Sequence, residues 1–134
     1  MSKKGSRRAS RQSEVSQEER ALTSGRVTAA HGRHYFVTTP AGERIEAHRR
    51  GKKGDVVVGD IVRISEAVSG VAAIESIEPR KSLLYRSDEW RIKSLAANVD
   101  QVAIVFASRP TFNPWFIWKA LLAAHEAGIP ALVI

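Results

Sequence analysis

Cysteine is absent from this 134-residue sequence, and so is any long apolar run. Without cysteine the chain can form no disulfide, perform no thiolate chemistry and hold no cysteine-ligated zinc. No segment approaches the roughly 18 consecutive apolar residues of a membrane span. Arg7-Arg8 resembles part of a twin-arginine export signal, but polar residues follow where an apolar region is needed. We therefore expect a cytoplasmic protein that makes no contact with membranes.

Motifs of the common enzyme classes are also missing. The sequence contains no Gly-x-Ser-x-Gly nucleophile motif and no Gly-x-x-x-x-Gly-Lys-Ser/Thr phosphate loop. The segment 51–54 (GKKG) lacks the first glycine of that loop, and we interpret it as a basic loop. Glu43 and Glu46 are three apart, so on a strand they would face opposite sides and form a poor acid–base pair. We predict no catalytic residue in this chain.

Histidine is scarce, with four residues in the whole chain. His31 and His34 are three apart, but no cluster of carboxylates completes a metal site beside them. We therefore expect solvated or half-buried histidines, no metal ligand and no cofactor in this chain.

Positive charge is concentrated in two patches, although the net charge of the chain is only +7. The first patch lies within residues 1–13, which contain no acid, and the second lies within residues 49–53. Their nine cations are Lys3, Lys4, Arg7, Arg8, Arg11, Arg49, Arg50, Lys52 and Lys53. They exceed the net charge, so the rest of the chain is slightly acidic. Such clustering favours a polyanionic partner; the alternative is a solubilising tail and a solvated loop.

The pattern of residues divides the chain into four parts. Residues 1–23 are polar and charged, a composition too poor in apolar side chains to fold, and we predict a disordered tail. Residues 24–80 contain five short strand-like segments separated by turn residues, which predicts a small β-barrel. The segments span residues 26–30, 33–39, 43–48, 60–65 and 71–77. Both an OB-fold, the oligonucleotide-binding barrel, and an SH3-like barrel fit this spacing.

The last two parts are a connector and the start of an α/β unit. Residues 81–100 mix charged and apolar residues without a clear period. Residues 101–107 (QVAIVFA) are typical of a strand covered on both faces. Asn113, Pro114 and Gly128 mark the ends of a helix, and a second apolar strand begins at Ala131. The sequence therefore predicts a mainly β protein, a five-stranded OB-fold-like small barrel followed by an incomplete βαβ unit in residues 101–134.

A barrel that binds RNA needs cations for phosphates and flat groups for bases or sugars. On an OB-fold, strands two and three usually form the binding face. Arg33, His34 and Tyr35 lie on the second predicted strand, and we add them to the nine clustered cations as candidate RNA-binding residues. Tyr35 and Phe36 should face opposite sides of the sheet, so at most one stacks on a base; alternatively, both rings pack.

Two longer motifs resemble a known family. They are Pro79-Arg80-Lys81-Ser82-Leu83-Leu84-Tyr85-Arg86 and Ala96-Ala97-Asn98-Val99-Asp100-Gln101 followed by an apolar strand, with Val58-Gly59-Asp60-Ile61-Val62 before them. In this order they resemble the RsgA (YjeQ) family of small-ribosomal-subunit-dependent GTPases. The resemblance covers residues 24–134.

The resemblance implies an OB-fold, then a circularly permuted GTPase domain, then a cysteine-rich zinc domain. Residues 101–134 would be a truncated start of the GTPase domain. The family's GTP, magnesium and zinc would bind in parts missing here, so this chain should not hydrolyse GTP alone. The implied role is late maturation of the small subunit, whose RNA would be the partner, with no DNA expected. The alternative is a stand-alone translation-type RNA-binding barrel without enzymatic activity.

Overall fold

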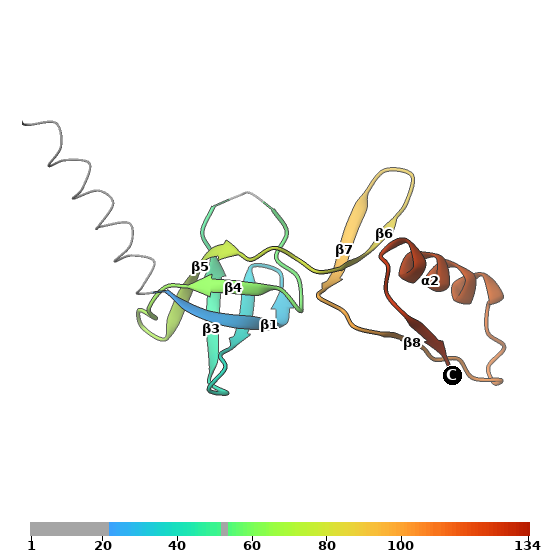
Figure 1. Cartoon of the computed structure of the whole chain (residues 1–134), viewed down its shortest axis with the longest axis horizontal. Coiled ribbons are helices and arrows are strands. Elements are labelled where there is room, and N and C mark those ends of the chain that lie inside the picture. Colours follow the sequence, from blue (N-terminus) through green and yellow to red (C-terminus); the bar gives the residue numbers. More distant parts are fainter. Residues whose placement is uncertain (1–21, 52–53) are drawn as a thin grey trace, which may run out of the picture.

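The computed structural model describes residues 22–51 and 54–134. Five strands form a closed barrel in the order β1-β2-β3-β5-β4, and β4 pairs back onto β1 (Figure 1). They are β1 (Thr23–His31), β2 (His34–Thr38), β3 (Arg44–Arg49), β4 (Ile61–Ile64) and β5 (Val71–Ile77). Among these pairs β3 and β5 alone run parallel. This order confirms the OB-fold and excludes the SH3-like alternative.

Alternation of side chains along each strand builds the barrel core. On β2, Tyr35 and Val37 are buried, while His34, Phe36 and Thr38, which alternate with them, lie on the outer face. Burial of such apolar side chains is the main force that holds a small barrel together. The core cluster comprises Val27, Tyr35, Val37, Ala47, Val56, Val62, Ile64, Ala72 and Ile74.

A β-hairpin follows the barrel, where the sequence shows no clear period. It consists of β6 (Leu83–Ser87) and β7 (Ile92–Ala97), which pair antiparallel with a register shift between Leu84 and Tyr85. The shift interrupts the alternation of apolar and polar residues by which a strand is recognised in a sequence. The segment expected to be a connector, residues 81–100, therefore contains a regular β-hairpin.

The last part forms the βαβ unit that the sequence predicts. Strands β8 (Val102–Ile104) and β9 (Ala131–Val133) pair in parallel, and α2 (Pro114–Glu126) connects them. The Asn113 side chain accepts a hydrogen bond of 3.0 Å from the Trp115 amide, which confirms the helix start. Gly128 has a φ of +67°, as expected of a glycine just beyond a helix end.

Strand β8 is shorter than the apolar run suggests. Residues 105–107 of that run lie outside it, and Val105 is exposed. The unit packs beside the hairpin, since α2 contacts β6 as well as β8 and β9. Within the described residues, no helix is long and apolar enough to cross a membrane.

Candidate nucleic-acid interface

The outer surface of β2 and β3 carries a row of polar and aromatic side chains. Because the strands pair antiparallel, His34 lies opposite His48, Phe36 opposite Glu46, and Thr38 opposite Arg44. We call these six residues the outer β2–β3 face. In an OB-fold this surface is the usual place for nucleic acid to bind.

The structure corrects one predicted member of the interface. Tyr35 is 8% exposed and belongs to the core cluster, so its ring is not available to stack on a base. Phe36 points the other way and is half-buried. The guanidinium carbon of Arg44 lies 4.0 Å from the centre of the Phe36 ring. A cation at this distance over an aromatic face is attracted to it, so Arg44 and Phe36 form a flat, charged platform.

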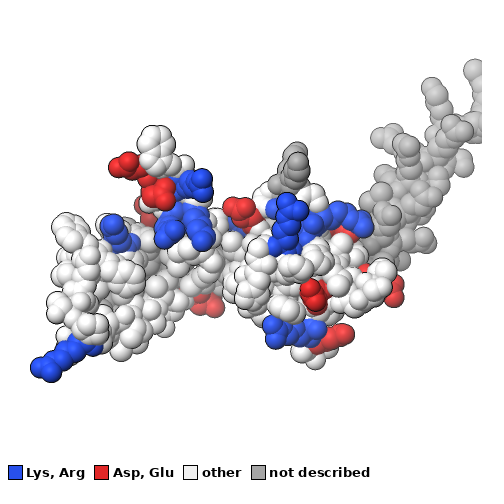
Figure 2. Space-filling model, turned by 180° about the vertical axis from the view of Figure 1, so that it is seen from behind, with Lys and Arg blue, Asp and Glu red and all other residues white. Residues whose placement is uncertain are grey.

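Three of the predicted cations gather at one end of this face. Arg33 is exposed in the turn just before β2, and Arg49 ends β3, the strand that pairs with β2. Arg50 follows and donates to Glu75 at 3.0 Å, although its side chain remains 73% exposed. Figure 2 shows several Lys and Arg side chains together on the barrel surface.

A hollow of about 390 Å³ opens beside these arginines. It is lined by Arg49, Arg50, Gly51, Ile74, Glu75, Ser76 and Ile77. The remaining predicted cations, Lys3, Lys4, Arg7, Arg8, Arg11, Lys52 and Lys53, lie outside the described residues.

His34, also predicted, lies within the outer β2–β3 face. Its Nδ1 atom is 3.1 Å from a carboxylate oxygen of Glu46. His31 is the register partner of His34 in the β1–β2 pair. The His34 ring also lies beside that of His48, with 4.6 Å between the ring centroids. No motif in the sequence points to His48, whose place beside His34 depends on the pairing of β2 with β3.

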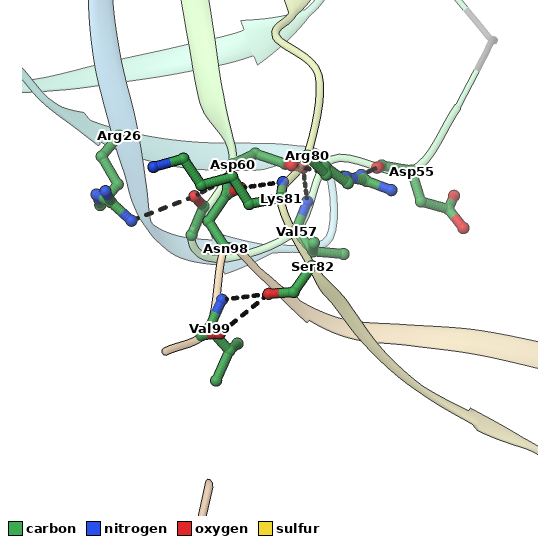
Figure 3. A network of polar contacts seen from close by, with 10 residues as sticks. Arg26, Asp55, Val57, Asp60, Arg80, Lys81, Ser82, Asn98 and Val99 are labelled. Atoms are coloured by element: carbon green, nitrogen blue, oxygen red, sulfur yellow. Dashed lines mark hydrogen bonds and ion pairs between the residues drawn. The ribbon is translucent and has the colours of Figure 1, made fainter. Parts of the chain in front are cut away.

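A second polar cluster joins the barrel to the hairpin (Figure 3). At its centre, Asp60 is fully buried and accepts two hydrogen bonds from Arg80, at 2.7 and 2.9 Å. Asp60 also accepts a bond of 2.9 Å from the Val57 amide, and Arg80 donates to the carbonyl of Asp55. The hydrogen bonds to Asp60 raise the pKa of Arg80 above its ordinary value, against the opposing effect of burial.

Asn98 and Gly59 complete this junction. The Asn98 side chain donates to the Gly59 carbonyl at 2.9 Å and accepts from the Lys81 amide at 2.8 Å. Gly59 has a φ of +93°, and a Cβ atom there would lie 1.9 Å from the Ala97 carbonyl oxygen. Only glycine allows the barrel loop to approach β7 this closely.

These contacts explain why the two longer motifs of the sequence occur together. Arg80, Lys81 and Ser82 come from the first motif, and Asn98 and Val99 come from the second. Ser82 Oγ donates to the Val99 carbonyl at 3.0 Å and accepts from the Val99 amide at 2.9 Å (Figure 3). The motifs therefore hold the junction together, a role that sequence reasoning missed. No short-range pattern in the sequence predicts the pairing of Asp60 with Arg80, because the two residues are 20 positions apart.

Comparison with known proteins shows which family this chain resembles. The family model described as RsgA GTPase matches residues 77–134, from the end of β5 to the end of the chain. The small ribosomal subunit biogenesis GTPase RsgA of Variovorax paradoxus (strain S110) is 46% identical over 114 residues, which cover 85% of this chain and 36% of that protein. Its namesake in Neisseria meningitidis serogroup C (strain 053442) is 43% identical over 122 residues, covering 91% and 40%.

Solved structures show the same arrangement. YjeQ from Thermotoga maritima superposes with a TM-score of 0.62 at 28% identity, covering 84% of this chain and 40% of that one. YloQ, a circularly permuted GTPase, gives a TM-score of 0.61 at 22% identity, covering 84% and 39%, and supports the fold alone. The chain thus spans less than half the length of these relatives. The part of the chain that these matches span belongs to the RsgA family.

Proposed function

We propose that this chain binds RNA of the small ribosomal subunit through the outer β2–β3 face and the arginines at its end. The observation that carries the proposal is the Phe36–Arg44 platform on the OB-fold strands that usually bind nucleic acid. Arg33, Arg49 and Arg50 lie toward the opposite end of the same two strands, where His34 pairs with His48. The relatives' name, small ribosomal subunit biogenesis GTPase, supports this choice of partner.

The arginines and the aromatic ring have different roles in the proposed binding. Arginines near the end of β3 neutralise phosphates, which provides most of the affinity without reading sequence. The Phe36 ring offers a surface for a base or a ribose, and Arg44 over the ring adds charge at the same point. A partner with splayed, single-stranded nucleotides suits such a surface better than a duplex.

We assign this binding to a protein that acts in small-subunit biogenesis in the cytoplasm, as part of a GTPase. The sequence contains no phosphate loop for GTP and its magnesium ion, and no cysteine for a thiolate-held zinc. The residues present therefore do not fit these groups, and no step of GTP hydrolysis is assigned to them.

The proposal is tested by the salt dependence of binding to small subunits or to a single-stranded ribosomal RNA fragment. Each phosphate neutralised contributes about 0.7 to 0.9 to the slope of log K against log salt. We expect Arg49→Ser/Arg50→Ser to reduce the slope by up to about 1.4 to 1.8 if both arginines meet phosphates. Phe36→Ala should weaken binding by roughly 1–3 kcal/mol with little change of slope.

The matched control is Arg109→Ser/Lys119→Ser, which removes two cations from the βαβ unit. It should leave the slope close to that of the parent chain. Equal slopes for both double variants, together with full affinity of Phe36→Ala, would show that this face is not the binding surface. The contribution of the patch in residues 1–13 is measured by its deletion in the same titration.

A further inference from the structure

Three side chains of types that can act as metal ligands lie together on the outer β2–β3 face. They are His34, Glu46 and His48, and their ligand atoms all lie within 4.8 Å of one another. His34 Nδ1 and the Glu46 carboxylate oxygen are 3.1 Å apart. Two ligand atoms bound to one zinc ion at about 2.0–2.2 Å in tetrahedral geometry are themselves a little over 3 Å apart, by simple geometry from the usual bond lengths.

The backbone fixes this arrangement. His34 and His48 occupy directly opposed positions of an antiparallel pair, where Cβ atoms lie about 4.5–5.5 Å apart. Glu46 is two residues before His48 on the same strand, so both side chains leave the same face of the sheet. Because β2 and β3 belong to a closed barrel, the three Cβ positions are fixed before any ion binds.

From this juxtaposition we propose that His34, Glu46 and His48 bind one Zn²⁺ ion on the surface of the barrel. Two imidazoles and a carboxylate are a donor set that zinc takes in proteins, with a water in the fourth position. Imidazole ligands disfavour calcium and magnesium, which prefer oxygen donors. The side chains are partly exposed, so the ion can enter directly from solvent.

This site is distinct from the cysteine-rich zinc domain that the family resemblance implies, because it uses nitrogen and oxygen ligands within the barrel. It also differs from the expectation drawn from the sequence, in which His31 and His34 had no carboxylate partner. The partners come instead from the neighbouring strand. The inference does not depend on RNA binding, since the ligands need no third component.

The test titrates the full chain with Zn²⁺ by calorimetry and with Co²⁺ by visible absorption. We expect one ion per chain and a cobalt spectrum typical of four or five ligands. His34→Ala, Glu46→Gln and His48→Ala should each weaken binding by about 100-fold or more, since loss of an outer-sphere partner alone costs roughly 10–100-fold. His125→Ala, which changes the histidine on α2, is the matched control and should bind like the parent.

A gain of signal separates ligation from a structural effect. The chain contains no cysteine, so His48→Cys should retain the ion and add a thiolate-to-cobalt charge-transfer band that the parent lacks. Circular dichroism of each variant verifies the fold. Absence of saturable Zn²⁺ binding by the parent, or binding that survives all three ligand substitutions, would overturn the proposal. In that event the His34–Glu46 contact is a surface ion pair only.

Discussion

At the scale of single residues, the junction between barrel and hairpin depends on one buried charge. Asp60 has no exposed surface, and its carboxylate is satisfied by Arg80 and by the Val57 amide. A buried carboxylate is tolerated only when it is paired and hydrogen-bonded. Because the pKa of Arg80 is raised, the guanidinium keeps its charge, and Arg80 loses its contribution to the pair only as the pH rises through that raised value.

Removal of Arg80 should therefore destabilise the protein strongly. We expect Arg80→Ala to lower the free energy of unfolding by about 3–5 kcal/mol, because it leaves Asp60 buried without a counter-charge. Urea denaturation followed by tryptophan fluorescence and circular dichroism measures the change.

The control for this prediction is Arg63→Ala. Arg63 also pairs with an acid, Glu78, at 3.0 Å, but both side chains are more than a third exposed. Exposed pairs contribute about 0–1 kcal/mol, so the control should lose little stability. Similar losses for Arg80→Ala and Arg63→Ala would contradict the role given to the buried pair.

At the scale of elements, the hairpin is the part least visible in the sequence. Its turn has a local signal, since the Asp88 side chain accepts hydrogen bonds from the amides of Trp90 and Arg91. Its strands do not, because the register shift after Leu84 breaks the alternation. The helix α2 shows the opposite case, because the residues that mark its ends lie next to those ends in the sequence. Asn113 and Pro114 mark its start, and Gly128 marks its end.

The βαβ unit exposes much apolar surface. Trp115, Phe116, Trp118 and Leu122 on α2 are each more than 60% exposed, and all three residues of β9 are exposed. Exposed apolar patches and unpaired strand edges favour association. We expect the full chain to self-associate as its concentration rises, and residues 1–100 to remain monomeric. Size-exclusion chromatography with light scattering compares the two. The cut follows Asp100 because Val99 is bonded to Ser82.

Two variants of the full chain identify the surface responsible. Trp115→Gln/Trp118→Gln should reduce association, because it makes the exposed side of α2 polar. Trp90→Gln removes an aromatic ring that is 89% exposed at the hairpin turn and should have little effect. A full chain that stays monomeric at all concentrations would contradict this prediction.

At the scale of the whole molecule, the barrel and the βαβ unit have different surfaces. The proposed binding surface lies on the barrel, and the exposed apolar residues of α2 lie on the other side of the hairpin (Figure 1). Figure 2 shows Lys and Arg side chains on the barrel, around the middle of the molecule and also at the end farthest from the barrel. The surface proposed for RNA and the exposed apolar surface of α2 therefore belong to different parts of the chain, so each can be changed by substitution without touching the other.

We expect this chain alone to bind no GTP. The backbone amides and lysine of a phosphate loop hold the phosphates in such enzymes, and the sequence contains no such loop. Calorimetric titration with GTP and Mg²⁺ should give no saturable heat. RsgA of Variovorax paradoxus, a GTPase by name, is the positive control. Saturable micromolar binding by this chain would mean that other residues recognise the nucleotide.

The sequence by itself determined those features whose physical cause is local. Short strand-like segments separated by turn residues predicted the five barrel strands, capping residues predicted the helix, and the motifs around Arg80 and Asn98 indicated the family. The tertiary structure decided what depends on contacts between distant segments. It ordered the strands as an OB-fold, turned Tyr35 into the core and Phe36 outward, and joined Asp60 to Arg80. It also brought His34 beside Glu46 and His48, because strand pairing, which no local pattern encodes, determines which side chains become neighbours.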